Sequence, residues 1–335
     1  MKNLLRLAAS FGLVLLSTRA QDQATTLCAA SQRARAIVRA TVVVATDPSP
    51  LWHRMLFRTD EVLKGPMPDE FSLLEPAGAC CGRSLFALRV GDACLLLLEQ
   101  RGPALHPFGG SRGVLADNPV VVSHLQALLQ AQNDSQRAAL LAASLDDPEP
   151  RIANDAAAAL AVLPQLALSS AGRTALVLAL QSAVQQGTTR TAPLLDAIVR
   201  LHDANMLDAV LPTYLTATSA DQARLLRQGL SRCAAPLVVD GLLPHVFGSE
   251  HTAVRAAQLL GTLPSADARI GLQLMWAHTS NPRVQLWLAE GLLAAGASGA
   301  LRTQMAASVP EPVLRLALRR HDQAKPFRSI DPRRQ

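Results

Sequence analysis

The sequence contains few aromatic residues, few lysines and few cysteines. Aromatic side chains make up 3% of its 335 residues, although hydrophobic residues as a whole make up 49%. A core built from leucine, alanine and valine, with so few rings, favours packed helices over a large β-sandwich. Lysine occurs only as Lys2, Lys64 and Lys325, so arginine supplies most of the positive charge. We interpret this arginine, alanine and leucine bias as that of a GC-rich bacterial genome.

The sequence also lacks an apolar run long enough to cross a bilayer, which takes about 20 residues. Its first 20 residues have the pattern of a signal peptide instead. The basic residues Lys2 and Arg6 precede a short apolar run over residues 7–17. Thr18 and Ala20 occupy the −3 and −1 positions of a cleavage site. We therefore expect cleavage near Ala20 and a secreted or periplasmic mature chain with no membrane span. The alternative is a segment kept as an uncleaved membrane anchor.

Positive charge gathers at the C-terminal end. The formal net charge is +6, and seven basic residues against two acidic ones lie from position 315 onward. A nucleic-acid-binding protein spreads basic charge over a binding face. We therefore predict no nucleic-acid partner, and we predict that residues 323–335 form a disordered basic tail.

Residues 28–116 have the pattern of a small β-domain. A continuous apolar run at residues 92–99 is typical of a strand buried on both faces. Glycine- and proline-containing turns separate the candidate strands. The five strands expected are residues 36–46, 53–63, 70–74, 92–99 and 114–116.

Three short motifs in this region occur in a familiar order. They are EVLKG at residues 61–65, Cys81-Gly82, and LRVGDACL at residues 88–95 before a glycine-rich turn. This order resembles the netrin-like module, an OB-type barrel shared with tissue inhibitors of metalloproteinases. The resemblance implies an all-β OB-type barrel over residues 28–116. The alternative is an unrelated small β-domain.

Four of the five cysteines, Cys28, Cys80, Cys81 and Cys94, fall in this region. A bridge between the adjacent Cys80 and Cys81 would be strained, which leaves two pairings. In netrin-like modules an N-terminal cysteine is bonded to a cysteine that precedes glycine, so the resemblance implies Cys28–Cys81 with Cys80–Cys94. The alternative is one bridge and two free thiols. Cys233 is expected to be a small buried hydrophobic residue.

Helical patterns begin at Asn118 and continue to the region of residue 320. Helices are expected over residues 118–131, 135–145 and 148–163, followed by helices that alternate with short polar turns. A similar sequence pattern recurs in the C-terminal half of the chain at intervals of about 30 residues, close to the period of stacked helix pairs. The positions aligned in this way are Leu194, Leu225, Val254, Val284 and Val313.

The best-defined repeat contains VRAAQLLG at residues 254–261. This stretch resembles HEAT repeats, which implies that residues 117–322 form an all-α HEAT-like solenoid after the barrel, in a multidomain chain. Val254, Ala257 and Leu260 share one broad helical face, which we expect inside the solenoid. The small residues Ala256, Ala257 and Gly261 would let another helix approach closely.

Known catalytic and ligand-binding motifs are missing. The sequence has no His-Glu-x-x-His, Cys-x-x-Cys, phosphate-loop or nucleophile-elbow motif. We predict that the chain is not an enzyme and has no catalytic, metal or cofactor site. Chromophore lyases of light-harvesting complexes also contain HEAT-like units and would be the enzyme alternative, but no residue here supports it.

These features together predict an extracytoplasmic interaction scaffold that binds a protein partner through its helical repeats. Trp276 and Trp287 are candidate partner-binding residues, although packing in the core explains them more simply. The alternative function is a secreted metalloprotease inhibitor acting through the netrin-like domain. Such inhibitors bind zinc with the amine and carbonyl of an N-terminal cysteine, whereas cleavage after Ala20 leaves seven residues before Cys28.

Overall fold

The computed structural model describes residues 26–49, 52–76, 88–245, 248–263 and 265–295, with isolated residues between 303 and 319. The expected signal peptide, Cys80, Cys81 and the expected tail lie outside these residues. The chain forms two compact units, which divide between Ala175 and Leu176. Each unit is described by itself.

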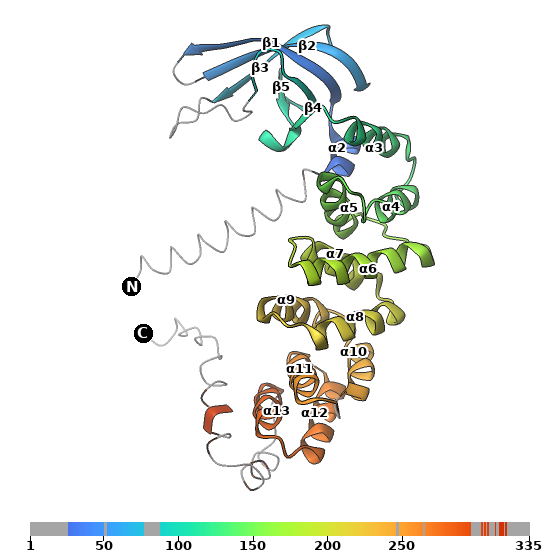
Figure 1. Cartoon of the computed structure of the whole chain (residues 1–335), viewed down its shortest axis with the longest axis vertical. Helices are drawn as coiled ribbons and strands as arrows, with labels where there is room; N and C mark the ends of the chain where they lie inside the picture. Colours follow the sequence, from blue (N-terminus) through green and yellow to red (C-terminus); the bar gives the residue numbers. More distant parts are fainter. Residues whose placement is uncertain are drawn as a thin grey trace, which may run out of the picture. The chain divides into compact units, whose positions relative to one another are not determined.

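The first unit begins with an antiparallel sheet in the order β3-β2-β1-β4-β5, in which β6 also pairs with β4. The sheet curls into a half-barrel, so that the edge strands β3 and β5 contact each other (Figure 1). Four of the five expected strands match β1 to β4, and the fifth matches β6. The strands are β1 (Ala36–Ser49), β2 (Trp52–Lys64), β3 (Glu70–Pro76), β4 (Ala93–Arg101), β5 (Ala104–Pro107) and β6 (Val114–Ala116).

The centre of the sheet is buried on both faces. One face carries a cluster of apolar side chains in which the rings of Phe57 and Phe71 stack 5.4 Å apart. The other face carries Ile37, Leu95 and Leu97, each fully buried. This burial confirms the expectation that the apolar run of residues 92–99 forms a strand without a solvent-facing side.

A short helix that the sequence did not predict, α2 (Leu27–Arg33), precedes the sheet and packs against α3 and α5. The end of β2 is fixed to it, because the Lys64 ammonium donates to the carbonyl oxygens of Ser31 (2.9 Å) and Gln32 (3.0 Å). Gly65 follows with φ +73°, and a side chain there would clash with the carbonyl of Arg35. The region expected to be wholly β therefore begins with a helix.

Helices α3 (Pro119–Gln130), α4 (Asp134–Ala143) and α5 (Pro150–Val162) complete the first unit, in agreement with the helices expected from the sequence. The cap residues of α3 and α5 are joined, because the Asn118 amide donates to the Glu149 carboxylate at 2.8 Å. Helix α6 (Ser170–Gln186) crosses the division between the units.

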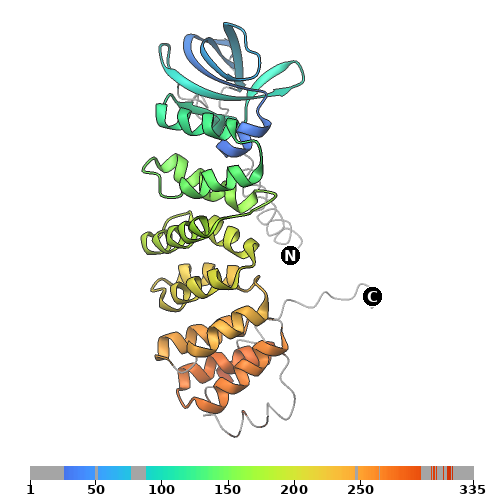
Figure 2. The same ribbon diagram turned by 90° about the vertical axis from the view of Figure 1, so that its right-hand side faces the viewer.

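Helices α7 to α13 of the second unit form two rows. Helices α8, α10 and α12 pack in succession in one row, and in the other α7 packs on α9 and α11 packs on α13 (Figures 1 and 2). Successive helices of a row begin 29 to 32 residues apart, as the sequence period predicts. Their bounds are α7 (Thr191–Leu201), α8 (Ala204–Thr216), α9 (Ala220–Leu230), α10 (Ala235–Leu242), α11 (Glu250–Leu260), α12 (Ala266–His278) and α13 (Pro282–Ala294).

Helix α11 contains the best-defined repeat. Ala257 and Leu260 are fully buried, as expected, and so is Ala256. The prediction was wrong for Val254, which is only half-buried, while the preceding Ala253 is 5% exposed. At the start of α11 the buried residue is therefore Ala253 rather than Val254, one residue earlier than expected. Small alanines on this face let α11 pack against α8.

Candidate partner-binding surface

Helix α12 has an apolar stripe on its solvent side. Ile270 is 53% exposed and Leu274 is 48% exposed. They are four residues apart, so their side chains share one helical face. Trp276 and Met275 lie on the opposite, buried side with Leu272. Helix α12 is therefore apolar on its core face and also at the centre of its solvent face.

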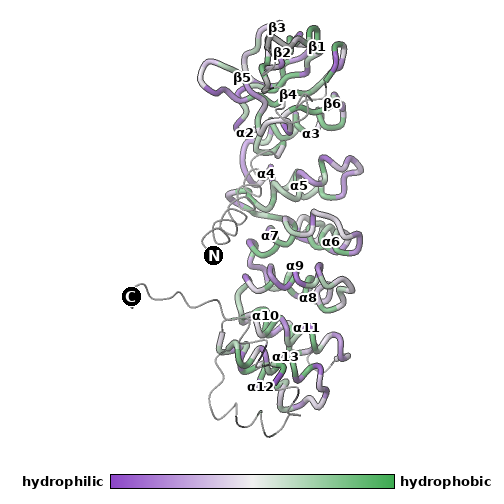
Figure 3. The backbone as a smooth tube through the Cα atoms, turned by 90° about the vertical axis from the view of Figure 1, so that its left-hand side faces the viewer, coloured by the Kyte–Doolittle hydropathy of each residue, from purple (hydrophilic) through white to green (hydrophobic). Residues whose placement is uncertain are grey.

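An exposed pair of large apolar side chains does not recur in α8 or α10. Asp208 and Pro212, at the positions of α8 that correspond to Ile270 and Leu274, are exposed, and the exposed residues of α10 are Pro236 and Asp240. Figure 3 shows hydrophobic and hydrophilic residues alternating along these helices, as expected of amphipathic helices with one buried face. Stacking alone therefore does not require apolar side chains on the solvent side of α12.

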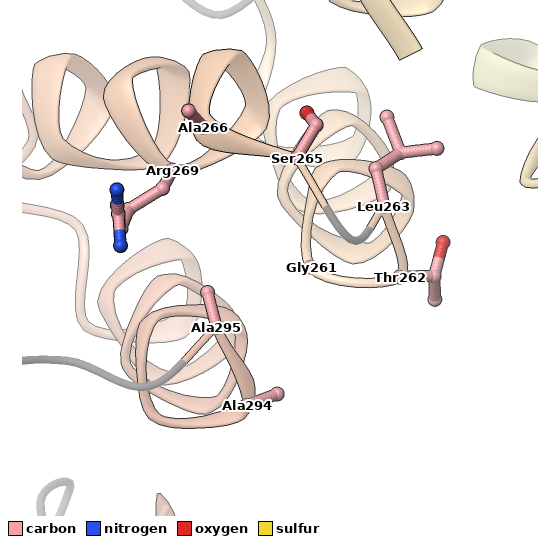
Figure 4. Close-up of a pocket in the computed structure, with 8 residues that line it drawn as sticks. All are labelled: Gly261, Thr262, Leu263, Ser265, Ala266, Arg269, Ala294 and Ala295. Carbon is pink, nitrogen blue, oxygen red and sulfur yellow. The ribbon is translucent and has the colours of Figure 1, made fainter. Parts of the chain in front are cut away.

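A pocket of about 360 Å³ lies at the N-terminal end of α12 (Figure 4). Ser265 caps the helix by accepting a hydrogen bond from the backbone N–H of Ala268 at 3.0 Å. The Arg269 side chain extends from α12 towards the helix that carries Ala295. This pocket is lined by Gly261, Thr262, Leu263, Ser265, Ala266, Arg269, Ala294 and Ala295.

A second pocket, of about 290 Å³, lies at the C-terminal end of α12. Buried side chains, including Met275 and Val284, line it together with the polar Glu250 and Asn281. The Asn281 amide (2.9 Å) and the Arg283 guanidinium (3.2 Å) donate to the Glu250 carboxylate, and these hydrogen bonds lower its pKa. Glu250 is thus ionised, and its carboxylate already accepts hydrogen bonds from Asn281 and Arg283. Such a group suits binding of a partner better than proton transfer.

The two tryptophans do not form a shared groove in these pockets. Trp276 is 8% exposed, which fits the simpler expectation of core packing, and Trp287 is half-buried in α13. Neither lines either pocket. Their role in partner binding stays a prediction. Sequence reasoning missed Ile270 and Leu274, although apolar residues four apart on the polar side of a helix are a readable signal.

The first unit contains a buried carboxylate at the start of α2. Asp155 of α5 is 5% exposed and accepts a hydrogen bond from the backbone N–H of Leu27 at 2.7 Å. Burial raises its pKa to about 7, against the opposing influence of Arg151, whose guanidinium is 3.8 Å away. This carboxylate stabilises the N-terminal end of α2 and so joins it to α5.

Cys28 lies beside this carboxylate. Burial, and next the charge of Asp155, raise the pKa of its thiol to about 11. Its backbone carbonyl accepts a hydrogen bond from the Ser31 hydroxyl at 2.8 Å. The residue is 4% exposed, so its main chain is engaged inside the molecule.

The other cysteines that the structure describes are also buried. The Cys94 thiol donates to the carbonyl of Ala40 at 3.4 Å, and burial raises its pKa to about 12. Cys233 is 8% exposed, as expected of a small hydrophobic residue. Because Cys80 and Cys81 lie outside the described residues, the two disulfide bonds stay predictions.

Over the described ranges, no group of three or more His, Cys, Asp or Glu side chains is placed to hold a metal ion. No helix in the described part of the chain is long and apolar enough to span a membrane. No protein-family model, curated protein or solved structure matches the chain. Function is therefore inferred from the residues of this chain alone.

Proposed function

We propose that the chain is an extracytoplasmic scaffold without catalytic activity, which binds a protein partner through the surface of its helical repeats. The observation that carries the proposal is the stripe of Ile270 and Leu274 on the solvent side of α12. Clustered apolar side chains at a protein surface mark interaction sites more often than isolated ones do.

The stripe is small, and its energetic contribution follows from its exposure. Full burial of an aliphatic side chain contributes about 1.5–3 kcal/mol, so covering the exposed half of Ile270 or Leu274 contributes roughly 1 kcal/mol each. The two pockets at the ends of α12 add concave sites for partner side chains. A recognition element with two apolar anchors and flanking pockets resembles a modest hot spot.

The other parts of the proposal rest on the sequence. The signal-peptide pattern of the first 20 residues supports export to the periplasm or the medium. The resemblance to HEAT repeats supports a solenoid that presents a long binding surface. The resemblance of residues 28–116 to netrin-like modules supports a second module that accompanies it.

The inhibitor alternative has no observation in its favour. A zinc-binding N-terminal cysteine needs an accessible amine and carbonyl. Here the carbonyl of Cys28 is bonded to Ser31, and the neighbouring Leu27 N–H is bonded to Asp155. The scaffold function is therefore the one that we propose.

The test is affinity capture of the tagged full-length chain from its native host after mild cross-linking. The double variant Ile270→Glu/Leu274→Glu should lose the partner recovered with the parent chain. Leu178→Glu, at a residue 59% exposed on α6, is the matched control and should retain it. Equal recovery by both variants, with their helical content unchanged by circular dichroism, would overturn the proposal.

A further inference from the structure

The solvent side of the row formed by α8, α10 and α12 carries acidic residues. Asp208 of α8, Asp240 of α10 and Asp267 of α12 are all exposed. Asp208 reaches the contact between α8 and α10, because a Cβ built at Gly241 would lie 3.2 Å from one of its carboxylate oxygens. Asp208 therefore lies next to the chain neighbour of Asp240, although the two are far apart in the sequence.

Asp267 lies on the edge of α12 that faces α10. It is one helical turn before Gly271, where an added Cβ would be 3.8 Å from Val239 of α10. Arg269 lies on the other edge, where it lines the pocket with Ala294 and Ala295 of α13. The acidic edge and the apolar stripe of α12 are thus adjacent, with the one arginine of this helix turned to the far side.

The row offers these carboxylates few cations, since Arg269 of α12 lies on the edge away from Asp267. The sequences of α8 and α10 contain no lysine or arginine. Among the described residues, no ion pair involves Asp208, Asp240 or Asp267. The arginines of this unit lie mainly in the other row, where several are paired or hydrogen-bonded: Arg200, Arg224, Arg227, Arg255 and Arg283.

We propose that the partner bound by this row is a basic amphipathic segment of polypeptide, which covers Ile270 and Leu274 with apolar side chains and places lysine or arginine opposite Asp208, Asp240 and Asp267. This inference rests on the proposed function and names the chemistry of its partner. Complementary charge fixes the orientation of such a segment and speeds its association, while the apolar contact supplies most of the affinity. The same carboxylates repel the phosphates of nucleic acids and acidic peptides.

The test uses two labelled helical peptides with the same leucine face, one with lysine and one with glutamate on its polar face. Fluorescence anisotropy measures their binding to the full mature chain at low and high salt. The lysine peptide should bind and the glutamate peptide should not. Asp208→Asn/Asp240→Asn should weaken binding about tenfold at low salt and reduce its salt dependence. The matched control is Asp221→Asn on α9, where the side chain is 88% exposed, and it should bind as the parent does.

Three results would overturn the inference: equal binding of both peptides, no effect of the Asp208→Asn/Asp240→Asn change, or full binding by Ile270→Ser/Leu274→Ser. Absence of binding by either peptide would overturn it as well. The proposed function fails separately, through the capture experiment with Ile270→Glu/Leu274→Glu. If the capture experiment loses the native partner but the chain shows no preference for the lysine peptide, the scaffold function stands. The inference that its partner is basic is then wrong.

Discussion

Gly261 at the end of α11 and Gly291 of α13 face each other so closely that neither position has room for a side chain. A Cβ at Gly261 would lie 2.9 Å from the Cα of Gly291, and a Cβ at Gly291 would lie 3.0 Å from the Cα of Gly261. Gly229, the tenth residue of α9 as Gly291 is of α13, makes room for Leu195 of α7. Glycines at these contacts let two helices of one row approach closely.

Gly291→Ala should destabilise the second unit by about 1–3 kcal/mol, because the added methyl group overpacks a backbone contact. Gly271→Ala is the matched control, since its Cβ would be 3.6 Å from the nearest side-chain atom. That change should be neutral or stabilising by up to about 1 kcal/mol, because alanine favours helix over glycine. Urea unfolding followed by circular dichroism measures both, and equal effects would contradict the close approach.

Lys64 and Gly65 belong to the motif that carries the netrin-like resemblance. In the structure Lys64 fixes β2 to α2, and Gly65 lies against the carbonyl of Arg35, between α2 and β1. Gly65→Ala should cost several kcal/mol, since it combines a positive φ with a clash against the Arg35 carbonyl. Lys64→Met should cost roughly 1–2 kcal/mol through the lost hydrogen bonds to α2. Thermal unfolding compares them with Gly102→Ala, where φ is +62° but an added Cβ has open space. A cost at Gly65 no larger than at Gly102 would contradict the clash.

The pKa of Asp155 predicts how stability depends on pH. Burial raises the pKa of Asp155 in the folded state from the ordinary 3.8 of an aspartate to about 7, so the folded state binds a proton more tightly than the unfolded state. This contribution to stability is present below about pH 4 and is lost as pH rises towards 7, by roughly 2–4 kcal/mol. Asp155→Asn should remove that slope, and Asp221→Asn should keep it. Urea midpoints from pH 4 to 8 measure the slopes, and parallel profiles for all three chains would disprove the assignment.

Ala257 is fully buried, so Ala257→Arg places an unpaired charge inside the second unit. Such a charge costs several kcal/mol, comparable with the stability of a whole domain. Hydrogen exchange should therefore lose protection across α9 to α13, with the strands of the first unit little changed. Equal loss in β1 and β4 would mean that both units unfold as one.

The sequence predicts most of this fold because its elements have strong local signals. Strong apolar and β-branched runs mark β1 and β4, and the helix starts follow a period of about 30 residues. Strand β5 was missed because Ala104–Pro107 is short and contains no β-branched or aromatic residue. Helix α2 was missed because it depends on Asp155, which is 128 residues from Leu27 in the chain.

In the candidate surface too, features set by local sequence are predictable, and features set by helix packing are not. The stripe of Ile270 and Leu274 depends only on spacing within α12, so it could have been read from the sequence. The proximity of Asp208 to Gly241, the chain neighbour of Asp240, depends on the register in which α10 packs on α8, which single-sequence patterns do not specify.

Site-specific photo-cross-linking in the native host tests the central claim most directly. A photoreactive phenylalanine analogue at position 274 should give a discrete cross-linked product with a partner polypeptide, because Leu274 lies on the proposed binding surface. The same analogue at position 178, where Leu178 is 59% exposed, should give none. A product at 178 but not at 274, or no product at either position, would contradict the claim that this chain is a scaffold that binds its partner through α12.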